Sequence, residues 1–102
     1  MAKEITVQNS NEFQEMIDNK DIRVSEAIVG TILKNLNTRK KELCVLSIHS
    51  IEENTIYDIT VEKKYFIETL EANLAHYVRE EKYEDCQHIS DVIAKLKLKT
   101  KK

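Results

Sequence analysis

The residues best able to do chemistry are two cysteines and three histidines, and Cys86 and His88 lie only two positions apart. A zinc site needs about four ligands that converge on one point. On a helix, side chains two positions apart point about 200° away from each other, so Cys86 and His88 do not converge. Cys44 and His49 fall on opposite faces of a strand by alternation. We therefore predict no metal site, with both cysteines in the core and His76 and His88 facing solvent.

Carboxylates form a second cluster in EEKYED, residues 80–85. An acid–base pair needs burial or a specific neighbour to separate the pKa values of its two carboxyl groups. A solvated turn offers neither, and acidic residues suit the first turn of a helix on electrostatic grounds alone. Phosphate loops and nucleophile elbows also need glycine, and Gly30 is the sole glycine, inside an apolar helical pattern. We therefore predict no catalytic residue, no cofactor and no enzymatic activity.

Basic residues gather in the connector Arg39-Lys40-Lys41 and in the Lys-rich C-terminus, which includes Lys97 and Lys99. If the two groups share one face, they can contact phosphates. Against this, the chain has a formal net charge of −2 and only 6% aromatic residues, which disfavours a stacking platform for bases. Cations also suit the C-terminal end of a helix. Nucleic-acid binding through these five residues is therefore the alternative function.

The N-terminal half must position these groups with a strand and two helices. Residues 4–8 alternate apolar and polar side chains, which indicates a short strand. Asn9 followed by Glu12 is a capping-box pattern and predicts a helix of about two turns. A broader apolar stripe predicts a second helix, with Ser25 as its N-cap and Asn37 at its end.

The segment LCVLSIHSIEENTIYDITVEK, residues 43–63, predicts a β-hairpin. Cys44, Leu46 and Ile48 share one face of the first strand by alternation, and Tyr57, Ile59 and Val61 share one face of the second. A turn centred between residues 53 and 54 places Ile48 opposite Ile59 and Leu46 opposite Val61.

From Lys64 the apolar period becomes helical. One stripe runs through residues 67–78 and includes Tyr77, which we expect in the core together with Tyr57. After a break at Lys82 or Tyr83, a second stripe repeats at spacings of three, four and three, through Cys86, Ile89, Ile93 and Leu96. Two amphipathic helices joined by a few residues predict an antiparallel helical hairpin.

The predicted fold is therefore α+β, with a small, about three-stranded antiparallel sheet and N-terminal helices, followed by a C-terminal antiparallel helical hairpin. We expect one domain, in which an α/β portion (1–62) packs on the helical hairpin (63–98), with a disordered tail at 99–102. No apolar run is long enough for a membrane span, and residues 1–10 lack the apolar core of a signal peptide. We expect a cytoplasmic protein with reduced cysteines.

Residues 70–97, LEANLAHYVREEKYEDCQHISDVIAKLK, resemble the UVR motif. This helical hairpin occurs in the helicase and nuclease subunits of bacterial excision repair and in Clp-associated proteins. The positions that carry the resemblance are Leu70, Leu74, Glu80, Glu81, Tyr83, Glu84, Cys86, Ile89, Asp91, Ile93 and Leu96. The chain departs from the family pattern at Cys86-Gln87, where the family favours alanines, and at Ser90, where it favours a base. Residues 1–62 show no such resemblance.

The resemblance implies a protein-binding hairpin that docks on a similar hairpin or on itself. We therefore predict a small non-enzymatic adaptor or regulator that binds another protein or forms a homodimer. Its Lys-, Asn- and Ile-rich composition suits a low-GC bacterium or a phage. The predicted partner-binding residues are Glu80, Glu81, Tyr83, Glu84 and Asp91. Tyr83 either covers the end of the hairpin core or anchors the partner.

Overall fold

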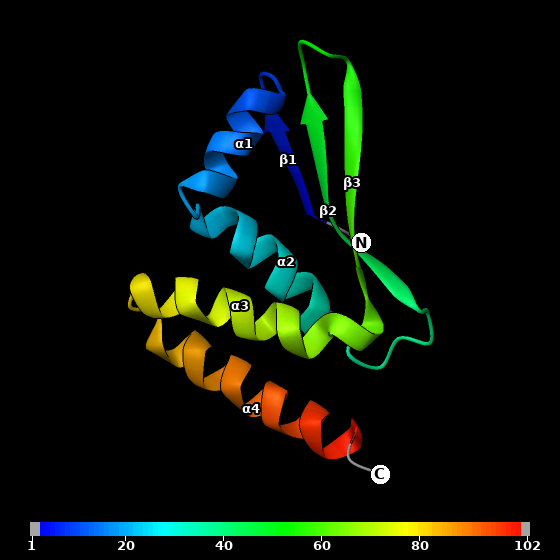
Figure 1. Cartoon of the computed structure of the whole chain (residues 1–102), viewed down its shortest axis with the longest axis vertical. Helices are drawn as coiled ribbons and strands as arrows, with labels where there is room; N and C mark the ends of the chain where they lie inside the picture. The colour runs from blue at the N-terminus through cyan, green and yellow to red at the C-terminus, as the bar shows by residue number, and fades with distance from the viewer. Residues whose placement is uncertain (1–2, 101–102) are drawn as a thin grey trace.

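The computed structural model of the chain describes residues 3–100. Its elements are β1 (Lys3–Val7), α1 (Ser10–Asp18), α2 (Ile22–Lys34), β2 (Glu42–Ser50), β3 (Thr55–Glu62), a short 3-10 helix η1 (Lys63–Tyr65), α3 (Phe66–Arg79) and α4 (Tyr83–Thr100). Figure 1 shows the sheet flanked by α1 and α2, with α3 beyond α2 and α4 outermost. The predicted α+β class is confirmed. Within this range, none of the helices is both long and apolar enough to span a membrane.

The sheet has the order β1-β2-β3 over the described residues. β2 and β3 form the predicted antiparallel hairpin, whereas β1 pairs with β2 in parallel. The expectation of an antiparallel sheet is therefore wrong for β1. The reason is that α1 and α2 return the chain to the end of the sheet from which β1 started, as a crossover between parallel strands must.

The register of the hairpin differs by two residues from the prediction. Ile48 pairs with Tyr57 and Leu46 pairs with Ile59. The turn is centred one residue earlier than expected, which shifts these two pairs by two. A shift of two leaves Leu46 and Ile48 on their predicted face, because side chains alternate with a period of two.

A β-bulge at Val45 breaks this alternation near the start of β2. Val45 and Leu46 are both fully buried, although they are neighbours in sequence. Cys44 is moved to the other face, where its Sγ lies 3.9 Å from Ser47 Oγ. Cys44 was predicted to share a face with Leu46 and to point to the opposite face from His49. Both predictions are wrong, because the bulge adds one residue to the strand.

The helix starts follow local capping groups. Asn9 caps α1 as predicted, since its side chain accepts a hydrogen bond from the Glu12 N–H at 3.0 Å. α2 begins before the predicted N-cap Ser25, because Asp21 accepts from the Arg23 N–H at 2.9 Å and also pairs with the Arg23 side chain at 2.8 Å. α2 ends at Lys34 rather than at the predicted Asn37.

α3 and α4 form the predicted antiparallel hairpin, in which α4 packs against α3 (Figure 1). Ile89 and Ile93 are buried in this hairpin. Cys86 and Leu96 are only partly buried and pack against the core, whereas Cys86 was expected within it. α4 continues through Thr100, so the expected disordered tail is helical at residues 99 and 100. Residues 101 and 102 of that tail lie outside the described residues.

A single cluster of buried side chains joins the sheet, α2 and the hairpin, over the residues that the structure describes. Tyr77 belongs to it, as predicted. Burial is the larger cause and the nearby Glu26 carboxylate a smaller one, and together they raise the pKa of Tyr77 to about 12. Tyr57 does not belong to it, since this side chain is 41% exposed. β3 is an edge strand of the sheet, and its side chains near the turn are not covered.

Candidate functional site

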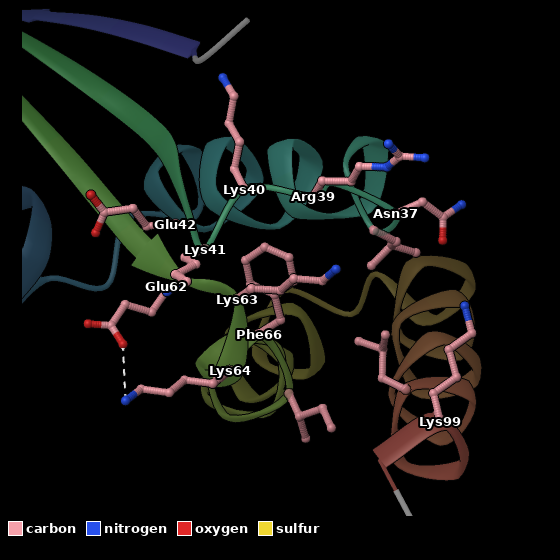
Figure 2. Close-up of a pocket in the computed structure, with 13 residues that line it drawn as sticks. Asn37, Arg39, Lys40, Lys41, Glu42, Glu62, Lys63, Lys64, Phe66 and Lys99 are labelled. Atoms are coloured by element: carbon pink, nitrogen blue, oxygen red, sulfur yellow. Dashed lines mark ion pairs between the residues drawn. The ribbon is translucent and has the colours of Figure 1, made fainter.

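A broad groove of about 990 Å³ opens where the chain leaves α2, β3 passes into α3, and α4 ends (Figure 2). We call it the basic groove. The residues that line it are Leu36, Asn37, Arg39, Lys40, Lys41, Glu42, Glu62, Lys63, Lys64, Phe66, Ile67, Leu96 and Lys99. Six are cationic and two are acidic, which leaves a formal charge of +4.

The cations come from three segments that are distant in sequence. They are Arg39, Lys40 and Lys41 in the connector, Lys63 and Lys64 in η1, and Lys99 in α4. Figure 2 shows them placed around Phe66. The connector is held beside η1 because the Lys63 N–H donates to the Lys41 carbonyl at 2.7 Å, next to the Glu42–Glu62 pair of β2 and β3.

Four of these cations remain available to a ligand. Lys63 Nζ donates to the Thr38 carbonyl at 2.6 Å, and Lys64 Nζ lies 3.3 Å from the Glu62 carboxylate. Within residues 3–100, the other four groove cations form no ion pair; they are Arg39, Lys40, Lys41 and Lys99. The groove therefore concentrates positive charge that the described part of the chain does not neutralise.

Apolar side chains form the floor of the groove. Leu36, Ile67 and Leu96 are partly buried and pack against the core, and Phe66 is only 2% exposed. The floor therefore offers aliphatic surface from the turn after α2, from α3 and from α4, while the Phe66 ring is covered. This combination of aliphatic floor and cationic rim suits a ligand that is itself both apolar and anionic.

Helix electrostatics do not account for every cation. Lys99 lies in the last turn of α4, where the helix dipole favours positive charge. Lys63 and Lys64 lie just before the first residue of α3, where the dipole disfavours it. Their position therefore costs α3 stability, which points to a role other than holding that helix.

The structure brings together most of the predicted nucleic-acid-binding residues. Arg39, Lys40, Lys41 and Lys99 line the groove, whereas Lys97 does not and instead pairs with Glu71 of α3 at 3.1 Å. Sequence reasoning missed Lys63, Lys64 and the apolar floor. The sequence did contain a signal for the two lysines. They directly follow β3, and β3 pairs with β2, the strand that begins after the connector.

The other predicted surface lies at the opposite end of the hairpin, and we call residues 80–85 the acidic turn. Hydrogen bonds from the Glu81 N–H to the Val78 carbonyl (3.0 Å) and from the Lys82 N–H to the Tyr77 carbonyl (3.0 Å) end α3. This Schellman motif places Glu81 in the left-handed region, with φ 58°.

The side chains of the acidic turn point largely into solvent. Glu80 pairs with its neighbour Arg79 at 3.4 Å. Among the described residues, Glu81, Glu84 and Asp85 form no ion pair. Tyr83 is 64% exposed.

Asp91, the fifth predicted residue, lies two turns further along α4, where its carboxylate accepts from Gln87 Nε2 at 2.9 Å. The structure thus gathers Glu80, Glu81, Tyr83 and Glu84, and leaves Asp91 apart.

A serine–histidine contact is present that sequence reasoning missed. Ser25 Oγ lies 2.7 Å from His76 Nδ1, so His76 is partly buried rather than solvent-facing as predicted. Burial, with the nearby Arg79 and Lys20 charges, lowers the pKa of His76. Ser25 is only 2% exposed, so a substrate cannot reach its hydroxyl. This pair is a structural link between α2 and α3.

No family model, curated protein or solved structure matches this chain. The resemblance of residues 70–97 to the UVR motif therefore stays a prediction. Among residues 3–100, the described His, Cys, Asp and Glu side chains form no group of three or more that could hold a metal ion.

Proposed function

We propose that this chain is a non-enzymatic protein-binding module whose basic groove takes up an acidic, partly apolar segment of a partner protein. One observation carries the proposal: cations without an ion pair stand around an aliphatic floor in one groove. The function class is the one that the UVR-like segment implies, while the site moves from the acidic turn to the other end of the hairpin. We place this activity in the cytoplasm, where Cys44 and Cys86, both free thiols, would stay reduced.

The floor favours a peptide over a nucleic acid. Bases bind largely by stacking on exposed aromatic faces, and the ring of Phe66 is buried. Leu36, Ile67 and Leu96 instead suit leucine-like side chains of an amphipathic segment. Carboxylates of the same segment can form charge-assisted hydrogen bonds with the cations of the rim. Such a ligand satisfies both halves of the groove at once.

In this proposal the chain acts as an adaptor or regulator with two surfaces on one helical hairpin. The basic groove binds the partner segment, and the acidic turn with Asp91 is the second surface. The hairpin is packed into the same core as the sheet, so the distance between the two surfaces is fixed.

Nucleic-acid binding remains the second candidate, because six cations from three segments can contact a phosphate backbone. Tyr65, beside the groove, is exposed and has Lys64 Nζ 5.2 Å from its ring centroid. It is the aromatic side chain here that could stack on a base. Binding of this kind would weaken steeply with salt, since each phosphate contact releases counterions.

Fluorescence anisotropy with two labelled probes tests the proposal. One probe is a synthetic peptide that carries glutamates and leucines at helical spacing, and the other is an oligothymidylate. The groove variant is R39E/K41E. The matched control is K3E/K95E, which reverses two exposed charges that do not line the groove.

We expect the wild type and the control to bind the peptide, and the groove variant to bind it at least about tenfold more weakly, as loss of two charge contacts implies. Peptide binding that the groove variant retains in full would refute the proposal. Binding of the oligothymidylate alone, lost in the groove variant, would replace it with the second candidate.

A further inference from the structure

We propose that the occupant of the basic groove is the acidic turn of a second copy of this chain, so that copies associate head to tail. This inference rests on the proposed function of the groove and names its partner.

The two surfaces lie at opposite ends of the same hairpin (Figure 1). The groove is built where α3 begins and α4 ends, and the acidic turn lies where α3 ends and α4 begins. α3 has 14 residues, so the two ends are about 21 Å apart at 1.5 Å per residue. An acidic turn therefore cannot reach the groove of its own chain, and only a second copy can supply it.

The charges of the two surfaces are complementary. The acidic turn carries three carboxylates that form no ion pair in the described part of the chain: Glu81, Glu84 and Asp85. The groove carries four such cations. The net charge of the whole chain is only −2, so two copies repel each other weakly at long range. Complementary patches on a nearly neutral molecule favour association in one defined orientation.

The apolar features are complementary as well. Tyr83 and Val78 are exposed beside the carboxylates of the acidic turn. A tyrosine ring can enter the groove and pack on the aliphatic floor of Leu36, Ile67 and Leu96, with its hydroxyl directed towards the cationic rim. Buried tyrosines surrounded by polar contacts are common anchors of protein interfaces.

This contact joins two different surfaces, so after pairing one copy keeps its groove unoccupied and the other keeps its turn unoccupied. Such heterologous contacts produce rings or open chains of subunits rather than a closed dimer. The association should weaken as salt is added, because the rim is exposed to solvent.

A charge-swap experiment by sedimentation velocity tests the inference on the full chain. The groove variant R39E/K41E keeps an intact turn, and the turn variant E81K/E84K keeps an intact groove. We expect the mass of the wild type to rise with concentration and to fall with added NaCl, and each variant alone to stay monomeric. An equimolar mixture should associate again, because the intact groove of the turn variant meets the intact turn of the groove variant, and the reversed groove and the reversed turn are also opposite in charge.

A wild type that stays monomeric at every concentration, or a mixture that does not associate, would overturn the inference. Two milder variants keep the test valid if a charge reversal prevents folding, which circular dichroism would reveal. E81G removes a carboxylate and relieves a positive φ, and Y83A removes the anchor; each should weaken self-association severalfold. Unchanged association in both variants would contradict the proposal.

The outcome is separable from that of the proposed function. If the acidic peptide binds the groove while the wild type remains monomeric, the proposed function stands and the self-association is wrong. If neither the peptide nor a second copy binds, both are wrong.

Discussion

The hydrogen bond between Ser25 and His76 shows how a single residue ties two layers of this molecule together. Ser25 is buried in α2, and His76 reaches it from α3. Burial lowers the pKa of His76, and the positive charges of Arg79 and Lys20 lower it further. The site therefore favours the neutral imidazole.

This pKa shift predicts how stability depends on pH. An unfolded histidine has a pKa of about 6.5, and His76 takes up its proton only at a lower pH when folded. The unfolded state therefore binds more protons between these two pKa values. The free energy of unfolding should be highest above pH 6.5 and should fall as the pH drops towards the folded pKa of His76. Urea unfolding of the wild type and of H76Q, from pH 8 to pH 5, measures this; an identical pH dependence in both proteins would contradict it.

Gly30 is a residue whose type is not explained by the fold. It lies in the interior of α2, and a Cβ atom added to it would meet nothing within 4 Å. G30A should therefore raise the free energy of unfolding by about 0.5–1 kcal/mol, because alanine loses less backbone entropy on folding. The matched control is A94G, at an exposed interior position of α4, which should lower it by a similar amount. Thermal or urea unfolding that shows G30A to be destabilised would reveal a contact at this site.

At the scale of the elements, the helix ends show how a chain with one glycine makes its turns. α1 and α3 both end in a Schellman motif, with Lys20 (φ 54°) and Glu81 (φ 58°) in the left-handed position. Glycine is the usual residue there, since a Cβ atom disfavours that conformation. The sequence therefore showed the breaks between helices but offered no glycine to mark where each helix ends.

The strain at Glu81 leads to a prediction about the hairpin. E81G should raise the free energy of unfolding by up to about 1 kcal/mol relative to E81A, because glycine adopts the left-handed region without a steric cost. Both variants lack the carboxylate, so their difference isolates the backbone effect. Urea unfolding of the two variants measures it, and a more stable E81A would contradict the assignment of the turn.

The positions of the helices and strands along the chain were largely predictable, whereas the way in which they pair and pack together was not. Apolar periods located all three strands and four helices of residues 3–100, since burial imposes a period of 2 or 3.6 on the sequence. The bulge at Val45 was not predictable, because Cys44, Val45 and Leu46 are all apolar and either alternation fits them. The parallel pairing of β1 follows from how α1 and α2 cross the sheet, which depends on tertiary packing. The groove escaped prediction for the same reason, as its walls come from three distant segments.

At the scale of the whole molecule, charge is separated along the helical hairpin. Cations gather at one end and carboxylates at the other, while the chain as a whole is nearly neutral. Like charges within the basic groove repel one another, and this repulsion opposes folding at low ionic strength. The arrangement is therefore suited to meeting a ligand rather than to maximal stability.

This separation predicts that salt stabilises the protein. Raising the ionic strength from near zero to about 0.15 M shortens the screening length to about 8 Å and should raise the melting temperature of a dilute sample. K41Q should melt higher than the wild type at low salt, and the difference should shrink as salt is added. Differential scanning fluorimetry checks both, and a melting temperature that falls with salt would contradict the account.

Recognition of an acidic and partly apolar protein segment by the basic groove can be observed by locating the bound peptide on the protein. Titration of ¹⁵N-labelled protein with the glutamate- and leucine-bearing peptide, followed by amide chemical shifts, gives this location. If the peptide occupies the groove, the shifts are centred on residues 36–42, 62–67 and 96–99. Shifts centred on the acidic turn and Asp91, or no shifts at all, would contradict recognition by the groove.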